Sequence, residues 1–255
     1  MKKCMCLNYD NTKTPSFCAQ SIKNAGFSHA FIFWGKDNNN NILQVKACHK
    51  AGLEIETAHT TFENINSMWL KGSLGDEMTE YFIKSVKEAK DYCIPTLIVH
   101  VSSSYTPPPF GEVGLERFKL ICEEADKNNI VIAFENLRRI EYLDYIMDNI
   151  DCNSKRFCFD CGHENIYNNG KGVLEKYSSL LTALHLHDNF GKEDDHILPF
   201  EGKINWETLA KRISRLKKDV IITLEVINWN NEPNFAAQAF ERACRIENLI
   251  KSTRL

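Results

Sequence analysis

Three carboxylates in the second half of the chain each follow a short apolar run directly. Glu135 follows VIAF, Asp160 follows FCF and Glu225 follows IITL. A lone carboxylate in such a place usually caps a strand or pairs with a cation. Several carboxylates at one site would raise one another's pKa values unless a cation compensated their charge. Carboxylate and imidazole ligands are typical of Zn2+, Mn2+ and similar ions, so we interpret these three residues as candidate metal ligands.

Most of the histidines follow the same pattern as the carboxylates. Six of the eight lie at, or a few residues after, the end of a predicted strand: His59, His100, His163, His185, His187 and His196. His29 and His49 lie elsewhere. Because His185 and His187 are two residues apart on one strand, both side chains should point to the same face. Their spacing leaves open which of the two binds metal and which contacts a substrate or packs in the barrel.

Short apolar runs and longer amphipathic segments alternate along the chain and would position these residues. The apolar runs span residues 3–7, 29–33, 53–57, 96–101, 131–135, 157–160, 183–187 and 221–226. Segments 81–92 and 115–128 have helical spacing of apolar residues, and Gly26 and Gly52 lie where a helix would end before a strand. Strands that alternate with helices predict βαβ units and a parallel sheet.

A single (β/α)8 barrel fits this pattern better than an open doubly wound sheet. The strand count is eight, and no GxGxxG or GxxxxGK[ST] phosphate loop follows the first strand. A barrel of this kind needs about 250 residues, and the chain has 255. We therefore expect one barrel domain over residues 1–255, with its site at the C-terminal ends of the strands.

Composition limits the classes of partner. The formal net charge of −3 argues against a surface built mainly to hold nucleic acid, although a local basic groove would not show in the total. No apolar stretch approaches the roughly 20 residues needed to span a membrane. Without a recognisable signal peptide we expect a cytoplasmic protein, whose ten cysteines would be free thiols. The oligomeric state is left open.

At these residues the sequence resembles the xylose isomerase-like barrel superfamily, and within it the sugar phosphate isomerase/epimerase group. The resemblance runs from about residue 58 to residue 225. It rests on AHTTF at 58–62, VHV at 99–101, FEN at 134–136, FDCGH at 159–163, HLHDN at 185–189, DDH at 194–196 and TLE at 223–225. Each stretch alone is weak, but their order and spacing over eight βα units are specific.

The resemblance implies a divalent metal held by Glu135, Asp160, His185 and Glu225. In the resembling epimerases the strand-five and strand-eight glutamates move the proton, which implies Glu135 and Glu225 as catalytic bases here. Further contacts to substrate or metal are implied for His163, Asp194 and His196, with His59, His100 and His187 as further candidates. Mn2+ or Zn2+ is the expected ion, with Mg2+ and Co2+ as alternatives, and the expected substrate is a sugar or sugar phosphate.

The superfamily also holds endonuclease IV, whose nine ligands for three zinc ions all have counterparts here. They are His59, His100, Glu135, Asp160, His163, His185, Asp194, His196 and Glu225. A zinc phosphodiesterase acting on abasic DNA is therefore the alternative function, and a barrel that binds a sugar without turnover is a third. The Cys-Gly before His163 and the loop after His59 favour the isomerase/epimerase, as does the short chain, which leaves little room for loops that probe DNA.

Aromatic residues near the predicted mouth could form a wall for the apolar C–H faces of a sugar. They are Phe33, Trp34, Phe62, Trp69, Phe110 and Trp229. Of the neighbours Phe33 and Trp34, Trp34 is the preferred substrate contact. Two other features have two interpretations each. Asp188 could orient an imidazole or cap a strand end, and the loop 105–111 (YTPPPFG) could be a lid or a rigid connection.

Overall fold

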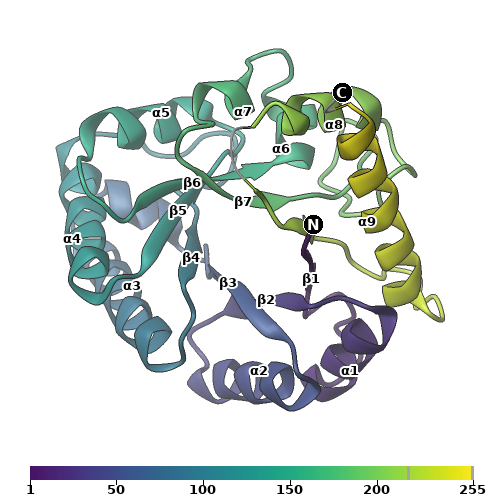
Figure 1. Ribbon diagram of the computed structural model, residues 1–255. Helices are drawn as coiled ribbons and strands as arrows, with labels where there is room; N and C mark the ends of the chain where they lie inside the picture. The colour runs from purple at the N-terminus through teal and green to yellow at the C-terminus, as the bar shows by residue number, and fades with distance from the viewer. Residues whose placement is uncertain (217–218, 254–255) are drawn as a thin grey trace.

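A computed structural model describes residues 1–216 and 219–253 of the chain. In this part of the chain eight parallel strands form a barrel and the helices surround it (Figure 1). The strands are β1 (Lys3–Cys6), β2 (His29–Trp34), β3 (Glu54–Thr60), β4 (Thr96–Val99), β5 (Val131–Glu135), β6 (Lys155–Asp160), β7 (Leu181–His185) and β8 (Ile222–Leu224). The helices are α1 (Pro15–Ala25), α2 (Asn38–Ala51), the 3-10 turn η1 (Ile65–Trp69), α3 (Ser73–Asp91), α4 (Glu112–Asn128), α5 (Ile140–Asn149), α6 (Cys161–Tyr167), α7 (Val173–Lys176), α8 (Trp206–Ser214) and α9 (Phe235–Ser252).

The strand order confirms the predicted (β/α)8 barrel. The sheet runs β7-β6-β5-β4-β3-β2-β1-β8, so the strands from β1 to β7 pair with their neighbours in sequence and β8 pairs with β1. The remaining gap, between β7 and β8, is bridged just beyond the ends of both strands. There the amide of Leu186 donates to the carbonyl of Thr223 at 2.9 Å, and the amide of Glu225 donates to the carbonyl of Leu186 at 3.1 Å. This bridge brings the end of β8 next to the end of β7.

All eight predicted strands are present, with small differences in length. β3 continues to Thr60 instead of ending at residue 57, which places His59 within the strand, and β8 ends at Leu224, which leaves Glu225 just beyond it. The predicted helical segments 81–92 and 115–128 lie in α3 and α4. Gly26 and Gly52 end α1 and α2 in the left-handed conformation, with φ of 111° and 71°, a region that glycine enters without a steric penalty.

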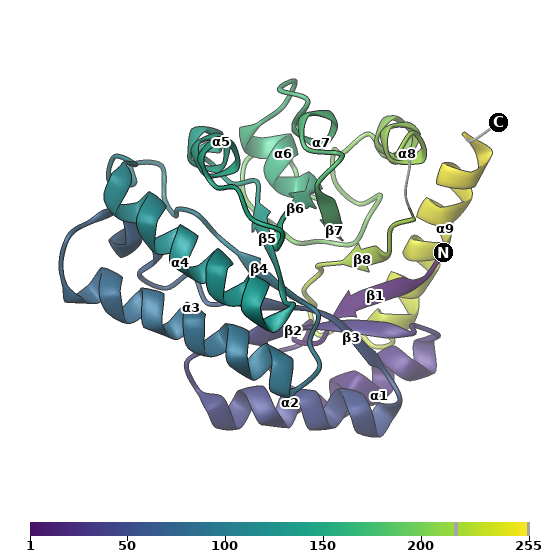
Figure 2. The same ribbon diagram turned by 60° about the vertical axis from the view of Figure 1, so that its left-hand side comes forward.

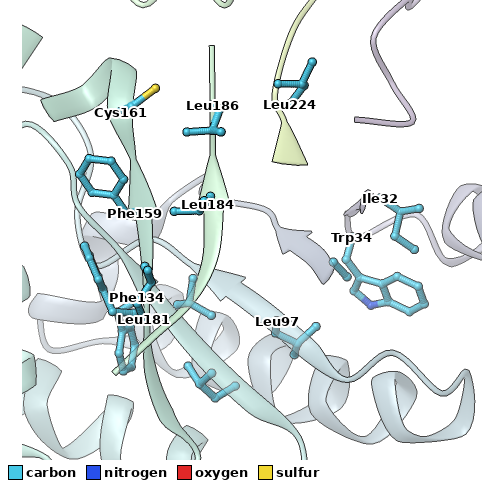
Figure 3. Packing of buried hydrophobic residues seen from close by; sticks show 14 of the residues in the cluster. Ile32, Trp34, Leu97, Phe134, Phe159, Cys161, Leu181, Leu184, Leu186 and Leu224 are labelled. Carbon is cyan, nitrogen blue, oxygen red and sulfur yellow. The ribbon is translucent and has the colours of Figure 1, made fainter. Parts of the chain in front are cut away.

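The main core lies between the barrel and the helices. Along each strand every second side chain points towards the helices, and the side chains between them point towards the barrel axis. On β2, Phe31 stacks on the ring of His185 and Phe33 on that of His59, whereas Ile32 and Trp34 belong to the buried hydrophobic residues shown in Figure 3.

The preference for Trp34 as a substrate contact was therefore wrong. The side chain of Trp34 is fully buried, its Nε1 donates to Glu88 of α3 at 3.1 Å, and its ring packs on Tyr92. The predicted strand stopped at residue 33, but β2 includes Trp34. Alternation along this longer strand puts Phe33 on the barrel axis and Trp34 on the helix side.

A cluster of charged groups joins the N terminus and the start of β1 to α9. Figure 2 shows the N terminus beside α9. Here Glu247 lies 2.7 Å from the amino group of Met1, 2.5 Å from Nζ of Lys3 and 2.6 Å from Nζ of Lys251. Among the described residues, no helix is both long and apolar enough to cross a membrane. The ten cysteines are free thiols, as expected.

Candidate metal centre

The C-terminal ends of the strands bring together the polar side chains that the sequence singled out. They come from the ends of β3 to β8 or from the segments that follow these strands: His59 from β3, His100 from the residue after β4, Glu135 from β5, Asp160 from β6, His163 from α6, His185 from β7, His187, Asp194 and His196 from the segment after β7, and Glu225 from the residue after β8. Parallel strands of a barrel end at one rim, so residues far apart in sequence meet there.

Glu135 is the centre of the first part of this cluster. Its side chain is buried and lies among three imidazoles. Oε1 is 2.8 Å from Nδ1 of His185, and Oε2 is 2.8 Å from Nε2 of His100 and 3.4 Å from Nε2 of His59. One carboxylate therefore contacts donors from three separate strand ends.

His185 joins the two glutamates that the resemblance implies as bases. Its Nδ1 is 2.8 Å from Glu135 and 3.0 Å from Oε2 of Glu225. Glu135, Asp160, His185 and Glu225 each offer a ligand atom, and these four atoms lie within 4.8 Å of one another. This quartet is the set implied by the resemblance, and its spacing suits four groups around one ion.

The second part of the cluster surrounds Asp194. Its Oδ2 lies 3.0 Å from Nε2 of His163 and 3.4 Å from Nε2 of His196. Nε2 of His187 lies 3.3 Å from Oδ1 of Asp160 and 3.7 Å from Oδ1 of Asp194. His187 thus points to the same rim as His185, as their spacing predicted, but it contacts different carboxylates.

Two imidazoles have their ring orientation fixed by backbone carbonyls. Nδ1 of His59 is 2.9 Å from the carbonyl of Thr60, and Nδ1 of His196 is 2.8 Å from the carbonyl of Glu225. A carbonyl can only accept, so each Nδ1 must donate its hydrogen. In the neutral ring Nε2 then carries the lone pair, and in both residues Nε2 faces a carboxylate oxygen. A histidine that ligates a metal has this arrangement.

The two glutamates of the centre, Glu135 and Glu225, have lowered pKa values, which favours their ionised forms. Burial alone would raise the pKa of Glu135, but the charge of His185 and the contacts with His100, His185 and His59 outweigh it and bring this pKa well below its ordinary value. Burial also acts against ionisation of Glu225, and His185 again reverses the effect, so that the pKa of Glu225 is lowered.

Two imidazoles beside Asp194, those of His163 and His196, have raised pKa values when no cation is present. Burial opposes protonation of His163, yet the charge of Asp160 and the contact with Asp194 raise its pKa to about 10. Burial likewise opposes protonation of His196, and Asp194 and Glu225 raise its pKa to about 9. Protons on imidazoles are exchangeable for a metal ion, because the neutral ring is the ligand.

Buried polar atoms without partners mark the same centre. Within residues 1–216 and 219–253, nine buried side-chain nitrogen or oxygen atoms lack a hydrogen-bond partner, and six of them belong to this cluster. One is Nε2 of His100, which approaches Glu135 to 2.8 Å but outside hydrogen-bond geometry. The others are Oδ2 of Asp160, Nδ1 of His163, Nε2 of His185, Nδ1 of His187 and Oδ1 of Asp194. Unpartnered buried polar groups are costly. Their concentration here, together with the mixed carboxylate and imidazole donors, fits a divalent cation.

Aromatic rings border the cluster on the side of β2 and β3. Phe33 stacks on His59 at 5.8 Å, and the exposed Phe62 stacks on His100 at 4.7 Å. Trp69 is not part of this wall, since it is buried and its Nε1 donates to the carbonyl of Val101. Phe31, which stacks on His185 at 5.1 Å, was missed, although alternation from Phe33 along the strand would have found it.

The contacts of Asp188 distinguish its two possible roles, orienting an imidazole or capping a strand end. Asp188 accepts hydrogen bonds from the amides of Asn189, Phe200 and Ile204 and from Nε1 of Trp206, at 2.7–3.1 Å. It therefore anchors the ends of the loop that carries Asp194 and His196 and does not orient an imidazole.

The contacts of the loop 105–111 with α5 favour a rigid connection over a lid. The hydroxyl of Tyr142 donates to the carbonyl of Pro108 at 2.5 Å, and Phe110 packs on Tyr142 and Tyr145. Nη1 of Arg139 donates to the carbonyl of Tyr105 at 3.0 Å. These contacts fix both ends of the loop on α5 and the turn before it.

Comparisons with known proteins agree with this architecture. The model of the family described as "Xylose isomerase-like TIM barrel" matches residues 20–245. The uncharacterized protein y4fM of Sinorhizobium fredii is 30% identical over 280 aligned residues, which cover 91% of this chain and 88% of that protein.

Among solved structures, a D-tagatose 3-epimerase-like protein superposes with a TM-score of 0.81 at 19% identity, over the whole of both chains. An L-ribulose 3-epimerase superposes with a TM-score of 0.80 at 10% identity, over all of this chain and 96% of that one. At such identities the similarity is one of fold.

Proposed function

The chain belongs to the xylose isomerase-like TIM barrel family, and from this premise we propose that it is a divalent-metal-dependent isomerase or epimerase of a sugar or sugar phosphate. The observation that carries the proposal is the convergence of Glu135, Asp160, His185 and Glu225, whose ligand atoms lie within 4.8 Å of one another at the barrel rim. The solved structures of similar fold include a D-tagatose 3-epimerase-like protein and an L-ribulose 3-epimerase, which supports a sugar as the class of substrate.

The proposed cofactor is Mn2+ or Zn2+, held by the quartet. Two glutamates, an aspartate and an imidazole form a mixed oxygen and nitrogen set that suits either ion. When bound, the ion would act as a Lewis acid that stabilises the negative charge formed when a proton leaves the carbon next to a carbonyl.

Glu135 and Glu225 are the proposed bases. Both carboxylates are ionised, since the pKa of each is lowered, and both contact the same nitrogen of His185. A carboxylate on each side of a bound sugar can remove a proton from one face and return one from the other. This pair is what an epimerisation needs, and an isomerisation needs one of the two together with a proton donor.

The remaining groups of the rim are proposed to bind the substrate. His163, whose Nδ1 has no partner, and His100 can donate to or accept from sugar hydroxyls. The rings of Phe33 and Phe62 offer apolar surface to the C–H faces of the sugar.

A metal-dependent phosphodiesterase is the second candidate, and one observation favours it. The nine donors that match endonuclease IV all lie at this rim, and the three possible metal groups include His59–Glu135–His185 and His187–His196–Glu225 in addition to the quartet. Such a set could hold more than one ion.

Metal stoichiometry combined with proton exchange separates the two candidates. The purified protein is dialysed against a chelator and reloaded with Mn2+ or Zn2+, and the bound metal is counted. It is then incubated with ketoses and ketose phosphates in D2O. About one essential ion per chain, with deuterium entering the carbon next to the carbonyl, supports the isomerase or epimerase. About three ions per chain, with cleavage of abasic DNA and no deuterium exchange, contradicts it.

A further inference from the structure

Arg138 lies in the turn after β5, three residues beyond Glu135, and is held by aromatic rings. Its guanidinium carbon is 4.8 Å from the ring centre of Tyr167 and 5.6 Å from that of Tyr105. The two tyrosine rings meet edge to face at 5.9 Å. Tyr105 comes from the loop after β4 and Tyr167 from the end of α6, so three separate segments meet at this half-buried arginine.

No acidic group compensates this arginine in the described part of the chain. The guanidinium of Arg138 takes part in none of the hydrogen bonds or ion pairs found there. The next residue is different: Arg139 donates from Nε to Glu141 at 2.6 Å and from Nη1 to the carbonyl of Tyr105 at 3.0 Å. The N–H groups of Arg139 are thus used in contacts within the protein, whereas those of Arg138 are available for a ligand.

The packing of Arg138 leaves its donors usable. A guanidinium that lies over an aromatic ring uses its face in the contact, whereas its five N–H groups point outward in the plane. Stacking also restricts the side chain, so less conformational entropy is lost when the donors bind an acceptor. The two tyrosine rings therefore hold the guanidinium in place and leave its hydrogen-bond donors without acceptors.

The position of this cluster connects it with the metal centre. The ring of Tyr167 lies 5.9 Å from that of His163, and His163 contacts Asp194 at 3.0 Å and approaches Glu135 to 3.9 Å. Arg138 is thus separated from the rim of the centre by one aromatic ring. A molecule that occupied the centre could extend past Tyr167 to reach it.

We propose that Arg138, held between Tyr105 and Tyr167, binds an anionic terminal group of the substrate, a phosphate or a carboxylate. This inference rests on the proposed function and narrows its substrate to a charged sugar. The planar fork of a guanidinium matches two oxygens of either group and forms charge-assisted hydrogen bonds with them. A neutral sugar would leave this cation without a counter-charge.

The test compares three probes that differ only at carbon 6: D-fructose, D-fructose 6-phosphate and D-fructuronate. Binding to the Mn2+-loaded protein is measured by calorimetry for the wild type, for Arg138→Met, which keeps the packing volume on the tyrosines, and for Arg138→Lys, which keeps the charge but not the fork. We expect at least one charged probe to bind the wild type about 10- to 100-fold more tightly than D-fructose, as for a charged hydrogen-bonded pair. This preference should disappear in Arg138→Met and be reduced in Arg138→Lys.

Arg156→Gln is the control and should keep the preference, because Arg156 lies at the start of β6, away from the rim, and donates to the carbonyls of Asn153 and Lys155. Equal binding of all three probes by the wild type contradicts the proposal. So does a preference that survives in Arg138→Met, since the anion would then bind the metal itself. The charged probe with the larger gain in affinity over D-fructose shows whether the site prefers a phosphate or a carboxylate.

Deuterium exchange is recorded on the same samples. An Arg138-dependent preference without exchange would count against the proposed reaction and still support the anion site, so the two failures are distinguishable.

Discussion

The two ends of the barrel each place a carboxylate among three groups that can carry positive charge, but the chemistry differs. At the N-terminal end Glu247 is paired with the amino group of Met1, Lys3 and Lys251. Ammonium groups of lysine side chains and amino termini in general lose their protons only above neutral pH. Charges of this kind stay in place at neutral pH.

At the C-terminal end Glu135 is surrounded instead by His59, His100 and His185. An imidazole gives up its proton near pH 6.5 in the absence of other influences, and the neutral ring is a metal ligand. A cluster of carboxylates therefore does not indicate function by itself. Carboxylates paired with ammonium groups form permanent ion pairs that stabilise the fold. Carboxylates paired with imidazoles can instead bind a metal ion that replaces the imidazole protons.

The largest effect is expected from Glu225→Gln at the C-terminal end. The amide cannot act as a base and is a poorer ligand, so turnover should fall by about 100- to 10,000-fold and metal affinity should drop. The half-buried side chain contributes little to the core, so the melting temperature of the metal-free protein should stay near that of the wild type. Full activity of this variant would show that Glu225 is neither base nor ligand.

Metal affinity should depend strongly on pH. Burial opposes protonation of His185, the imidazole among the four proposed ligands, but Cys158, Glu225 and Glu135 outweigh this effect and raise its pKa well above the ordinary value in the absence of metal. An ion that displaces this proton binds more weakly as pH falls, by about tenfold per pH unit. Calorimetric titrations with Zn2+ in buffers of different ionisation enthalpy would measure the proton release. An affinity independent of pH between 6 and 8 would contradict displacement.

A smaller effect, on stability alone, is expected from Glu247→Gln at the N-terminal end. The contacts with Lys251, Lys3 and the amino group of Met1 lower the pKa of Glu247. Because the folded-state pKa is lowered, the stabilisation is present above the unfolded-state pKa of about 4.3 and is lost as pH falls below it. Urea unfolding at pH 7 should show a loss of about 1 kcal/mol, and this loss should become smaller as pH falls from 5 towards 2. Turnover at pH 7 should not change, and a large loss would blur the distinction between the two ends.

The smallest effect is expected from His29→Asn. His29 lies at the start of β2, where its ring is 3.2 Å from Glu54 and 3.3 Å from Lys2, at the opposite end from the metal centre. Steady-state rates should stay within about twofold of the wild type, since substitutions away from special features change little. A loss as large as that of Glu225→Gln would mean that the functional end has been assigned wrongly.

Much of this arrangement could be predicted because, in a barrel of parallel βα units, the position of a residue in the sequence determines the end of the barrel at which it lies. A carboxylate after an apolar run must lie at the rim, which is why Glu135, Asp160 and Glu225 could be placed together without coordinates. Trp34 was assigned wrongly because β2 is one residue longer than predicted. Consecutive side chains of a strand point to opposite faces, so Trp34 points towards the helices when Phe33 points towards the barrel axis.

Other features depend on contacts that no local pattern contains. The hydrogen bonds of Asp188 reach as far as Trp206. Arg138 is defined by rings from Tyr105 and Tyr167, which lie on opposite sides of it in sequence. Nothing in the pair Arg138-Arg139 indicates which of the two is free. That difference comes from the packing of α6 and the loop after β4.

The central claim is that carboxylates and imidazoles from separate strands share a divalent cation at the C-terminal rim. Anomalous scattering from crystals of the Mn2+-loaded protein tests it most directly. We expect a peak about 2.0–2.3 Å from ligand atoms of Glu135, Asp160, His185 and Glu225. A fully loaded protein whose Mn2+ lies on the outer helices, with no peak among these four side chains, would contradict the claim.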